Sequence, residues 1–300
     1  VPCQRHSPST SAASTLKLDV EQGNVDVAWR SLSPTDVASL QKETDKVKVV
    51  TGNGIAIRYL VFNTSLAPAN NVAVRQAVAY SIDRDSIAKN VYNGTVQPLY
   101  SMVPQGLAGA NTAYKDLYGA TPDPDKAKSV LAAAGVKTPV DITLWWTPSH
   151  YGAVSGDEYT EIKRELESTG LFKVTLQDAE WDTYSKAYPA DQYAAFQLGW
   201  FPDYPDADDY LAPFYLQGGF YKNHYDNPQI DTLITQEEGE TDATKRTAEI
   251  DQIQTLAAKD VPTIPIWQGN QVAATGLTVT GVDKTFDPSY TFRMWLIGKS

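Results

Sequence analysis

Residues 199–215 contain the side chains in this sequence that are best suited to binding a ligand. Six aromatic rings and four carboxylates fall within this stretch. Three prolines prevent a continuous helix, and the stretch is too polar for a central strand, so we predict a long loop. A ring offers apolar area at small entropic cost, and a carboxylate holds a cation or a donor. The candidate ligand-binding residues are Trp200, Phe201, Asp203, Tyr204 and Asp206. The alternative is a loop that buries its rings in its own domain and leaves its aspartates solvated.

Other residues that could carry out catalysis or bind a metal are few. The three histidines, His6, His150 and His224, are scattered and do not have the spacing of a zinc-binding helix. No G-x-S-x-G motif occurs, although a hydrolase triad using His150 or His224 stays open because triads are defined by geometry. The acidic residues at 203–209 could bind calcium, but their spacing is not that of an EF-hand loop. The sequence therefore predicts no catalytic residue, no metal and no cofactor.

Composition narrows the class of protein. The chain has 300 residues, a net charge of −11 and 42% hydrophobic residues. Nucleic acid is not an expected partner, because phosphate binding requires a clustered Lys/Arg footprint. No apolar run approaches the roughly twenty residues that span a bilayer. The single Cys3 excludes an internal disulfide. Residues 1–14 lack hydrophobic periodicity, so we expect a disordered leader, and they show no signal-peptide pattern.

The remaining pattern alternates strands and helices, which is typical of an α/β fold. Strands are predicted at residues 25–29, 47–50, 55–63, 140–146, 174–176 and 194–199, with a plain turn at 52–54. Helices are predicted at residues 33–40, 72–82, 86–91, 123–135, 158–168, 181–188, 227–234 and 242–259, with Arg75 on the flank of its helix. Prolines make residues 263–267 an edge or irregular strand. Residues 279–282 and 290–296 are predicted to form the last strand. Ligands gather at the carboxyl ends of the strands in such folds, which is where residues 200–204 are placed.

Several motifs together resemble the extracytoplasmic solute-binding proteins of family 5, the peptide and nickel receptors of ABC importers. They are VRQAVAYSIDR at residues 74–84, VYNG at 91–94, SMVP at 101–104, DPDKAKSVLAAAG at 123–135 and AAKDVPTIPIW at 257–267. Within residues 123–135, Val130 replaces a leucine of the family pattern. The resemblance implies a periplasmic-binding-protein-like type II lobe, with a mixed sheet, flanking helices and a partial second lobe.

The resemblance also implies a domain division and a function. Residues 66–275 would form the ligand-binding lobe, and residues 15–65 with 276–300 part of the first lobe. The function would be solute binding for an ABC importer, with an oligopeptide as ligand, a membrane permease as partner, and a monomeric state. The location would be extracellular or at the cell envelope. The motifs match the second half of longer family members, so the chain is either a fragment or a shortened relative.

One residue role follows from the same resemblance. The string GWFPDY at residues 199–204 is similar to the family's loop in which an aspartate receives the α-ammonium of a peptide, and this implies that role for Asp203. Pro202 and the extra Asp206, Asp208 and Asp209 depart from the pattern and leave the ligand open. The alternatives are an oligosaccharide-binding receptor, a hydrolase built on a receptor lobe, and a purely structural fragment.

Overall fold

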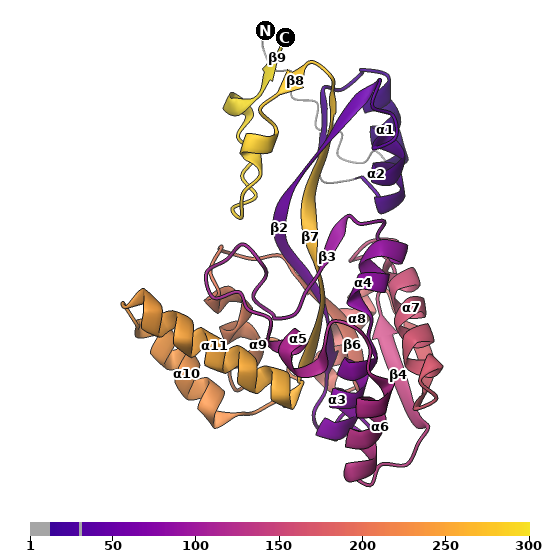
Figure 1. The fold of residues 1–300 in the computed structure, drawn as a ribbon, viewed down its shortest axis with the longest axis vertical. Helices are drawn as coiled ribbons and strands as arrows, with labels where there is room; N and C mark the ends of the chain where they lie inside the picture. The colour runs from indigo at the N-terminus through magenta and orange to yellow at the C-terminus, as the bar shows by residue number, and fades with distance from the viewer. Residues whose placement is uncertain (1–12, 30–31) are drawn as a thin grey trace. The chain divides into compact units, whose positions relative to one another are not determined.

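The computed structural model describes residues 13–29 and 32–300, which group into two compact units. The described residues of unit 1 lie within Val1–Gly54, Asn93–Thr95 and Asn270–Ser300, and unit 2 comprises Ile55–Tyr92 and Val96–Gly269. The long strands β2 (Val47–Phe62) and β7 (Thr263–Gly276) contribute residues to both units (Figure 1). The units are thus divided within these strands, whereas the lobe boundaries expected at 65/66 and 275/276 stay a prediction.

Unit 2 is built on a mixed sheet, which confirms the expected α/β class. Its strands follow the order β7-β2-β6-β4-β5, with β3 paired beside β7. Strand β4 is parallel to both β5 and β6, whereas β6 is antiparallel to β2. The remaining strands of this unit are β3 (Val96–Pro98), β4 (Val140–Trp146), β5 (Phe172–Asp178) and β6 (Ala195–Trp200).

The helices of unit 2 begin where the sequence supplies local caps. The Asp123 carboxylate accepts from the backbone N–H of Lys126, and Pro124 occupies the first turn, as predicted. Asn71 and Asp242 cap α3 and α11 in the same way. The helices are α3 (Val72–Ser81), α4 (Arg84–Ser86), α5 (Ala113–Tyr118), α6 (Pro124–Ala133), α7 (Ser155–Ser168), α8 (Trp181–Ala187), α9 (Ala212–Tyr215), α10 (Pro228–Gly239) and α11 (Ala243–Asp260). A π-helix, η1 (Ile87–Val91), and 3₁₀ turns η2 (Tyr188–Ala190) and η3 (Asp208–Tyr210) complete the unit.

The two faces of this sheet carry different side chains, because successive residues of a strand point to opposite faces. Leu60 and Phe62 of β2 join the main hydrophobic core, which also includes Val78 of α3 and Ile162 of α7. Tyr59 faces the other way and packs against Phe214 and Tyr221 with ring centroids 5.6 Å away in each case. Figure 1 shows α10 and α11 lying side by side, and these helices contact each other along their length.

Unit 1 combines short elements with the outer parts of β2 and β7. Strand β1 (Val27–Trp29) pairs antiparallel with residues 273–275 of β7, and the ring of Trp29 stacks on that of Phe292 at 4.5 Å. Helix α2 (Pro34–Leu40) is capped by Ser33 as predicted. Helix α1 (Ala13–Glu21) includes the last two residues of the expected leader, and residues 1–12 lie outside the described part of the chain. The other elements are β8 (Val279–Thr280), β9 (Gly298–Lys299), η4 (Asp283–Thr285) and η5 (Met294–Leu296).

Three sequence predictions about strands are wrong. Residues 52–54 form no turn, because β2 runs unbroken through them. A Cβ on Gly52 would lie 2.7 Å from Cβ and Cδ2 of Phe286. The glycine is therefore explained by the close packing of Phe286 against the strand, and not by a turn. Residues 290–296 are not a strand, since they contain η5, and only residues 298–299 return as β9.

The third correction concerns β7, which is an interior strand and not an edge strand. It has β2 on one side and both β1 and β3 on the other. The prolines are tolerated because β3 pairs with residues 267–269 and β1 with residues 273–275, beyond Pro262 and Pro265. The carbonyl of Pro265 accepts from Nε of the buried Arg84 at 2.7 Å. The Arg84 side chain thus provides the hydrogen bond that the carbonyl of Pro265 requires.

Candidate functional site

The aromatic loop begins where β6 ends. Strands β4 and β6 are parallel, so their carboxyl ends meet at one edge of the sheet, and residues 201–207 leave the sheet at that edge. Ligands of α/β sheets bind outside the carboxyl ends of parallel strands. The loop therefore occupies the edge of unit 2 where a ligand is expected.

Asp209 organises the loop from within. Its Oδ2 accepts hydrogen bonds from the indole Nε1 of Trp200 at 2.9 Å and from the backbone N–H of Asp203 at 3.0 Å. The residue is only 1% exposed, and burial raises the pKa of its carboxyl, whereas the hydrogen bond from Trp200 lowers it. Sequence reasoning grouped Asp209 with its acidic neighbours and missed this role, because only the folded loop shows which carboxylate turns inward.

The predicted ligand-binding residues fall into different environments. Phe201 and Tyr204 are about half exposed, at 49% and 47%, and Asp203 is exposed as well. Within the described part of the chain, the carboxylate of Asp203 accepts no hydrogen bond. Trp200 is partly buried, with its ring 5.1 Å from that of Phe214. Three of the five candidates are thus exposed on a loop whose backbone donates to Asp209.

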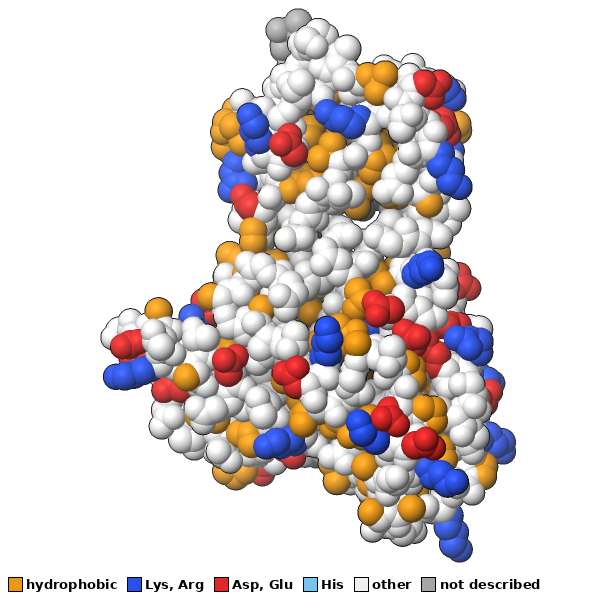
Figure 2. All heavy atoms as spheres, in the orientation of Figure 1, with side chains coloured by type: hydrophobic (Ala, Val, Ile, Leu, Met, Phe, Trp, Pro, Cys, Tyr) orange, Lys and Arg blue, Asp and Glu red, His pale blue; other side chains and the backbone are white. Residues whose placement is uncertain are grey.

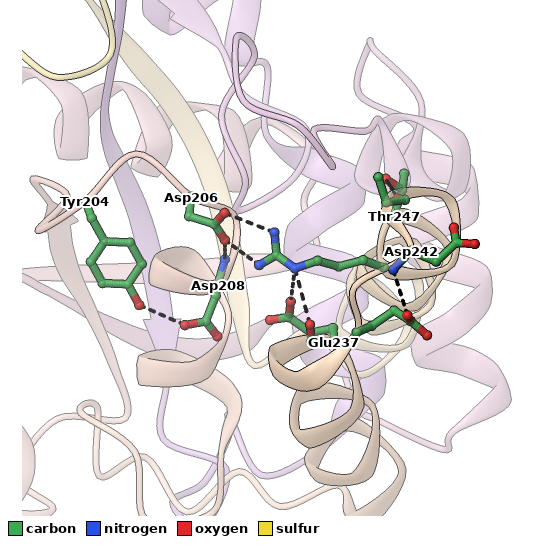
Figure 3. Close-up of polar contacts among 9 residues, drawn as sticks. Tyr204, Asp206, Asp208, Glu237, Asp242 and Thr247 are labelled. Carbon is green, nitrogen blue, oxygen red and sulfur yellow. Dashed lines mark hydrogen bonds and ion pairs between the residues drawn. The ribbon is translucent and has the colours of Figure 1, made fainter.

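Asp206, the fifth candidate, is tied to the helices instead. Its two carboxylate oxygens accept from Nη1 and Nη2 of Arg246 at 3.0 and 2.6 Å, and this guanidinium lowers the pKa of the Asp206 carboxyl. Nε of Arg246 donates to Oε2 of the buried Glu237 at 2.9 Å. The close-up in Figure 3 shows Asp206 and Glu237 contacting the same guanidinium from two sides, while Tyr204 donates to Asp208 at 2.8 Å. Arg246 therefore connects the loop to α10 and α11.

Burial controls the charge of this cluster. It raises the pKa of Glu237 to about 7, while the field of Arg246 lowers it and contact with Asp208 raises it again. Oε1 of Glu237 and Oδ1 of Asp208 are both buried without a donor in the described part of the chain. A proton on Glu237 would relieve the repulsion between these two carboxyls. Because of that proton, a single guanidinium is enough to stabilise Asp206, Asp208 and Glu237 in one cluster.

Sequence reasoning also missed Arg58, which lies at the same edge of the sheet. It stands on β2 directly opposite Gly199 of β6. Its guanidinium carbon lies 4.4 Å from the ring centroid of Tyr151 and 5.1 Å from that of Trp267. The one available signal was a lone charge in the apolar run at residues 55–62.

The histidines and acidic residues suggest no further chemistry. His150 stacks on Trp181 at 3.7 Å, and Nε2 of His224 lies 2.8 Å from Oδ1 of Asp191. Over residues 13–29 and 32–300, no group of three or more His, Cys, Asp or Glu side chains is arranged to hold a metal ion. Among the described helices, none combines the length and apolar character that a membrane crossing requires. On the face seen in Figure 2, basic and acidic side chains are interspersed rather than separated by sign.

Comparison with known proteins assigns the family. The model of the bacterial extracellular solute-binding proteins, family 5 Middle, matches residues 8–222. The chain belongs to this family. Similar proteins include the heme-binding protein A of Haemophilus influenzae, 28% identical over 77% of the chain and 43% of its own length. The dipeptide-binding protein of Escherichia coli is 27% identical over 78% of the chain and 44% of its own length. The chain thus spans about half the length of the curated relatives it matches.

Solved structures agree with this assignment. The dipeptide binding protein from Pseudoalteromonas sp. SM9913, in complex with Met-Leu, has a TM-score of 0.78 and 25% identity, over 96% of the chain and 56% of its own. HbpA2 from Haemophilus parasuis, with a TM-score of 0.81 and 22% identity, covers 96% of the chain and 56% of its own. These neighbours confirm the periplasmic-binding-protein-like fold. The relatives are named as binding proteins and not as enzymes, in agreement with the absence of a predicted catalytic residue.

Proposed function

We propose that this chain is the solute-binding part of a receptor for an ABC importer and that its solute is a peptide. Family membership supports the general class, and relatives named for dipeptide, glutathione and heme support a small organic ligand. The observation that carries the peptide assignment is the exposed carboxylate of Asp203, which lies within two residues of the exposed rings of Phe201 and Tyr204 in the same loop. The permease partner, a location outside the cytoplasm and a monomeric state are parts of the same proposal.

Asp203 is suited to receive the α-ammonium group of a peptide. Its backbone is anchored by Asp209, so the loop is ordered before the ligand arrives, and little entropy is lost on binding. A hydrogen bond between a carboxylate and an ammonium is shorter and about twice as strong as one between neutral groups. Phe201 and Tyr204 would cover the apolar parts of the ligand. The loop thus supplies one charge and two apolar contacts.

Binding by this chain alone should be weak. Closure of two lobes over a solute buries most of a ligand's surface in hinged receptors. The chain spans 44% of the E. coli dipeptide-binding protein, so part of such an enclosure lies outside the match. Each loss of about 1.4 kcal/mol weakens binding tenfold, and we therefore expect dissociation constants above the micromolar range. Submicromolar binding of a peptide or sugar would contradict this expectation.

The test uses a free-amine tripeptide and its N-acetylated form. Acetylation should weaken binding to the wild type by roughly tenfold or more, because it removes the charge that Asp203 would contact. Asp203→Asn should remove this difference, whereas the control Asp125→Asn, at an exposed carboxylate on α6, should keep it. NMR titration can follow affinities in the millimolar range. If both forms bind equally to all three proteins, Asp203 is not the ammonium anchor.

An oligosaccharide is the second candidate ligand, because the exposed rings of Phe201 and Tyr204 could stack on sugar faces. Equal binding of both peptide forms together with saturable binding of a trisaccharide would favour it. Turnover of an ester or peptide substrate that a serine-directed reagent abolishes would instead support a hydrolase. Light scattering on the purified chain tests the monomeric state.

A further inference from the structure

Two carboxyl groups of unit 2 interact without a hydrogen-bond donor between them. Glu237 of α10 is fully buried, and its Oε1 has no partner among the described residues. Oδ1 of Asp208, in η3, is buried and unpartnered in the same part of the chain. The influence of Asp208 on the pKa of Glu237 shows that the two side chains are neighbours. If both were ionised, they would repel each other in a site that water does not screen.

The remaining polar atoms around this pair are already engaged. Nε of Arg246 donates to Oε2 of Glu237, and both of its Nη atoms donate to Asp206 (Figure 3). Oδ2 of Asp208 accepts from the hydroxyl of Tyr204. A proton on Glu237 would turn its Oε1 into a donor and leave Oδ1 of Asp208 as the acceptor. Such a bond between an acid and a carboxylate is of the strong, charge-assisted kind.

This pair lies where the aromatic loop meets the helices. The backbone N–H of Asp208 donates to Oδ1 of Asp206 at 2.9 Å, so the two residues that face α10 and α11 are bonded to each other. Asp208 also accepts from Tyr204, whose ring is 47% exposed. Loss of the proton would leave the ion pair of Arg246 with Asp206 in place and would push Asp208 away from α10. A change of charge on Glu237 would therefore reach an exposed side chain of the loop.

We propose that Glu237 and Asp208 share one proton, that this proton holds the aromatic loop against α10, and that its loss as the pH rises through neutrality loosens the loop. The effect on solute binding rests on the proposed function, because Tyr204 is one of its candidate ligand-binding residues.

The direction of the effect follows from proton linkage. Burial raises the pKa of Glu237 from its ordinary value near 4.5 to about 7; the charge of Arg246 lowers it, and Asp208 raises it. A loosened loop removes Asp208 and admits water, so the pKa of Glu237 falls and the proton is released. The attached loop thus binds more protons than the loosened loop. Attachment is strongest below about pH 4.5 and weakens as the pH rises to about 7.

The test compares the wild type with Glu237→Gln. The amide oxygen of glutamine can accept from Arg246, while its NH₂ group donates to Asp208 at every pH. Hydrogen exchange is measured at the backbone N–H groups of Asp206 and Asp208, which donate to the Tyr204 carbonyl and to Oδ1 of Asp206. The loop sequence is the same in both proteins, so the ratio of their exchange rates at one pH removes the intrinsic effect of pH on exchange.

This ratio, wild type over Glu237→Gln, should rise at least about tenfold between pH 5 and pH 8, because one bound proton changes an equilibrium by up to about tenfold per pH unit. The other acids nearby, Asp206, Asp209 and Glu249, are present in both proteins, so the ratio isolates Glu237. A ratio that does not change with pH, or one that falls, would overturn the proposal.

The matched control is Glu165→Gln on α7. Glu165 is also buried, and burial raises its pKa to about 8, but its Oε2 accepts from the backbone N–H of Asp83 before α4. Glu165→Gln should exchange like the wild type in the loop at both pH values. If it removes the pH dependence as Glu237→Gln does, the effect is not specific to this pair. Should Glu237→Gln not fold, Asp208→Asn places the permanent donor on the loop side and should remove the pH dependence as well.

Peptide binding is measured separately, so that the two proposals can fail independently. The affinity of the wild type for a free-amine tripeptide, relative to that of Glu237→Gln, should fall from pH 5 to pH 8. If the exchange ratio rises but no peptide binds, the proposed function fails and the shared proton stands. If a peptide binds but the exchange ratio stays constant, the shared proton alone is refuted.

Discussion

Replacing Arg246 with methionine should destabilise unit 2 far more than replacing other paired arginines. The substitution keeps an unbranched side chain but removes the cation that contacts Asp206 and Glu237. The side chains of Arg246, Asp206 and Glu237 are 27%, 39% and 0% exposed. The pair with Asp206 is solvated and contributes no more than about 1 kcal/mol. The pair with the buried Glu237 matters more, because removing one partner of a buried ion pair lowers the free energy of unfolding by about 3–5 kcal/mol.

Proton uptake limits this cost. The pKa of Glu237 is already raised to about 7, so the carboxyl can become neutral when its cation is removed. We therefore expect a loss of about 2–4 kcal/mol in the free energy of unfolding, below the sum of the two pairs. The melting temperature should fall by about 2–4 °C for each kcal/mol. Urea denaturation at pH 7, followed by tryptophan fluorescence, measures the loss.

The matched control is Arg164→Met. Arg164 also makes a two-point contact with a carboxylate, donating to Glu161 at 2.8 and 2.5 Å, but its side chain is 61% exposed. Its loss should stay below about 1 kcal/mol. The double variant Arg246→Met/Glu237→Gln should recover at least about 1 kcal/mol, because the buried charge is gone. Equal losses at Arg246 and Arg164, or strict additivity in the double variant, would refute this account of the cluster.

Three further predictions concern single residues. Relative to Glu237→Gln, the wild type should lose stability as the pH rises from about 4.5 to about 7, because the Glu237 carboxyl keeps its proton in the folded state and releases it in the unfolded state. Chemical denaturation of both proteins at pH 5 and pH 8 measures this loss. A difference in stability that does not change with pH would exclude the raised pKa of Glu237. Asp209→Ala should lower the free energy of unfolding by about 2–4 kcal/mol, because the indole N–H of Trp200 and the backbone N–H of Asp203 lose their acceptor. Asp209→Asn keeps an acceptor oxygen and should lower it less. Equal losses for the two variants in denaturation experiments would contradict this reasoning. Gly52→Ala should lower stability by about 1–3 kcal/mol through its contact with Phe286, whereas Gly239→Ala, with open space around it, should not; calorimetry that shows no difference would argue against the close packing.

Local structure followed from local sequence wherever the signal lies within a few residues. Ser33 with Pro34 and Asp123 with Pro124 begin their helices as predicted, because a cap acts on N–H groups two or three positions away. The alternation at residues 140–146 and the loop after Trp200 were predictable for the same reason. The alternation of strands and helices indicated the α/β class, and motifs spread over the chain were sufficient to suggest the family.

The burial of charge was not predictable in this way. Arg75 was expected on the flank of its helix, yet it is 6% exposed and donates to the carbonyls of Ala69, Asp260 and Val261. Its partners at the C-terminal end of α11 and at the residue after it lie 185 residues or more along the chain, so no helical pattern could reveal them. An arginine looks the same in the sequence whether water or backbone carbonyls surround it.

The candidate site also combines features that local sequence predicts with features that it does not. Composition and proline content are local properties, so the sequence predicted an aromatic, acidic loop over residues 199–215. The structure confirms a loop only at residues 201–207, because residues 199–200 end β6, residues 208–210 form η3 and residues 212–215 form α9. Which carboxylate turns inward, which pairs with a helix and which stays exposed depends on contacts between distant parts of the chain. Arg246 meets Asp206 across 40 residues, and Arg58 meets Tyr151 and Trp267 across the sheet. Such contacts depend on strand order and helix packing, and these set the electrostatic environment of every charge at this edge.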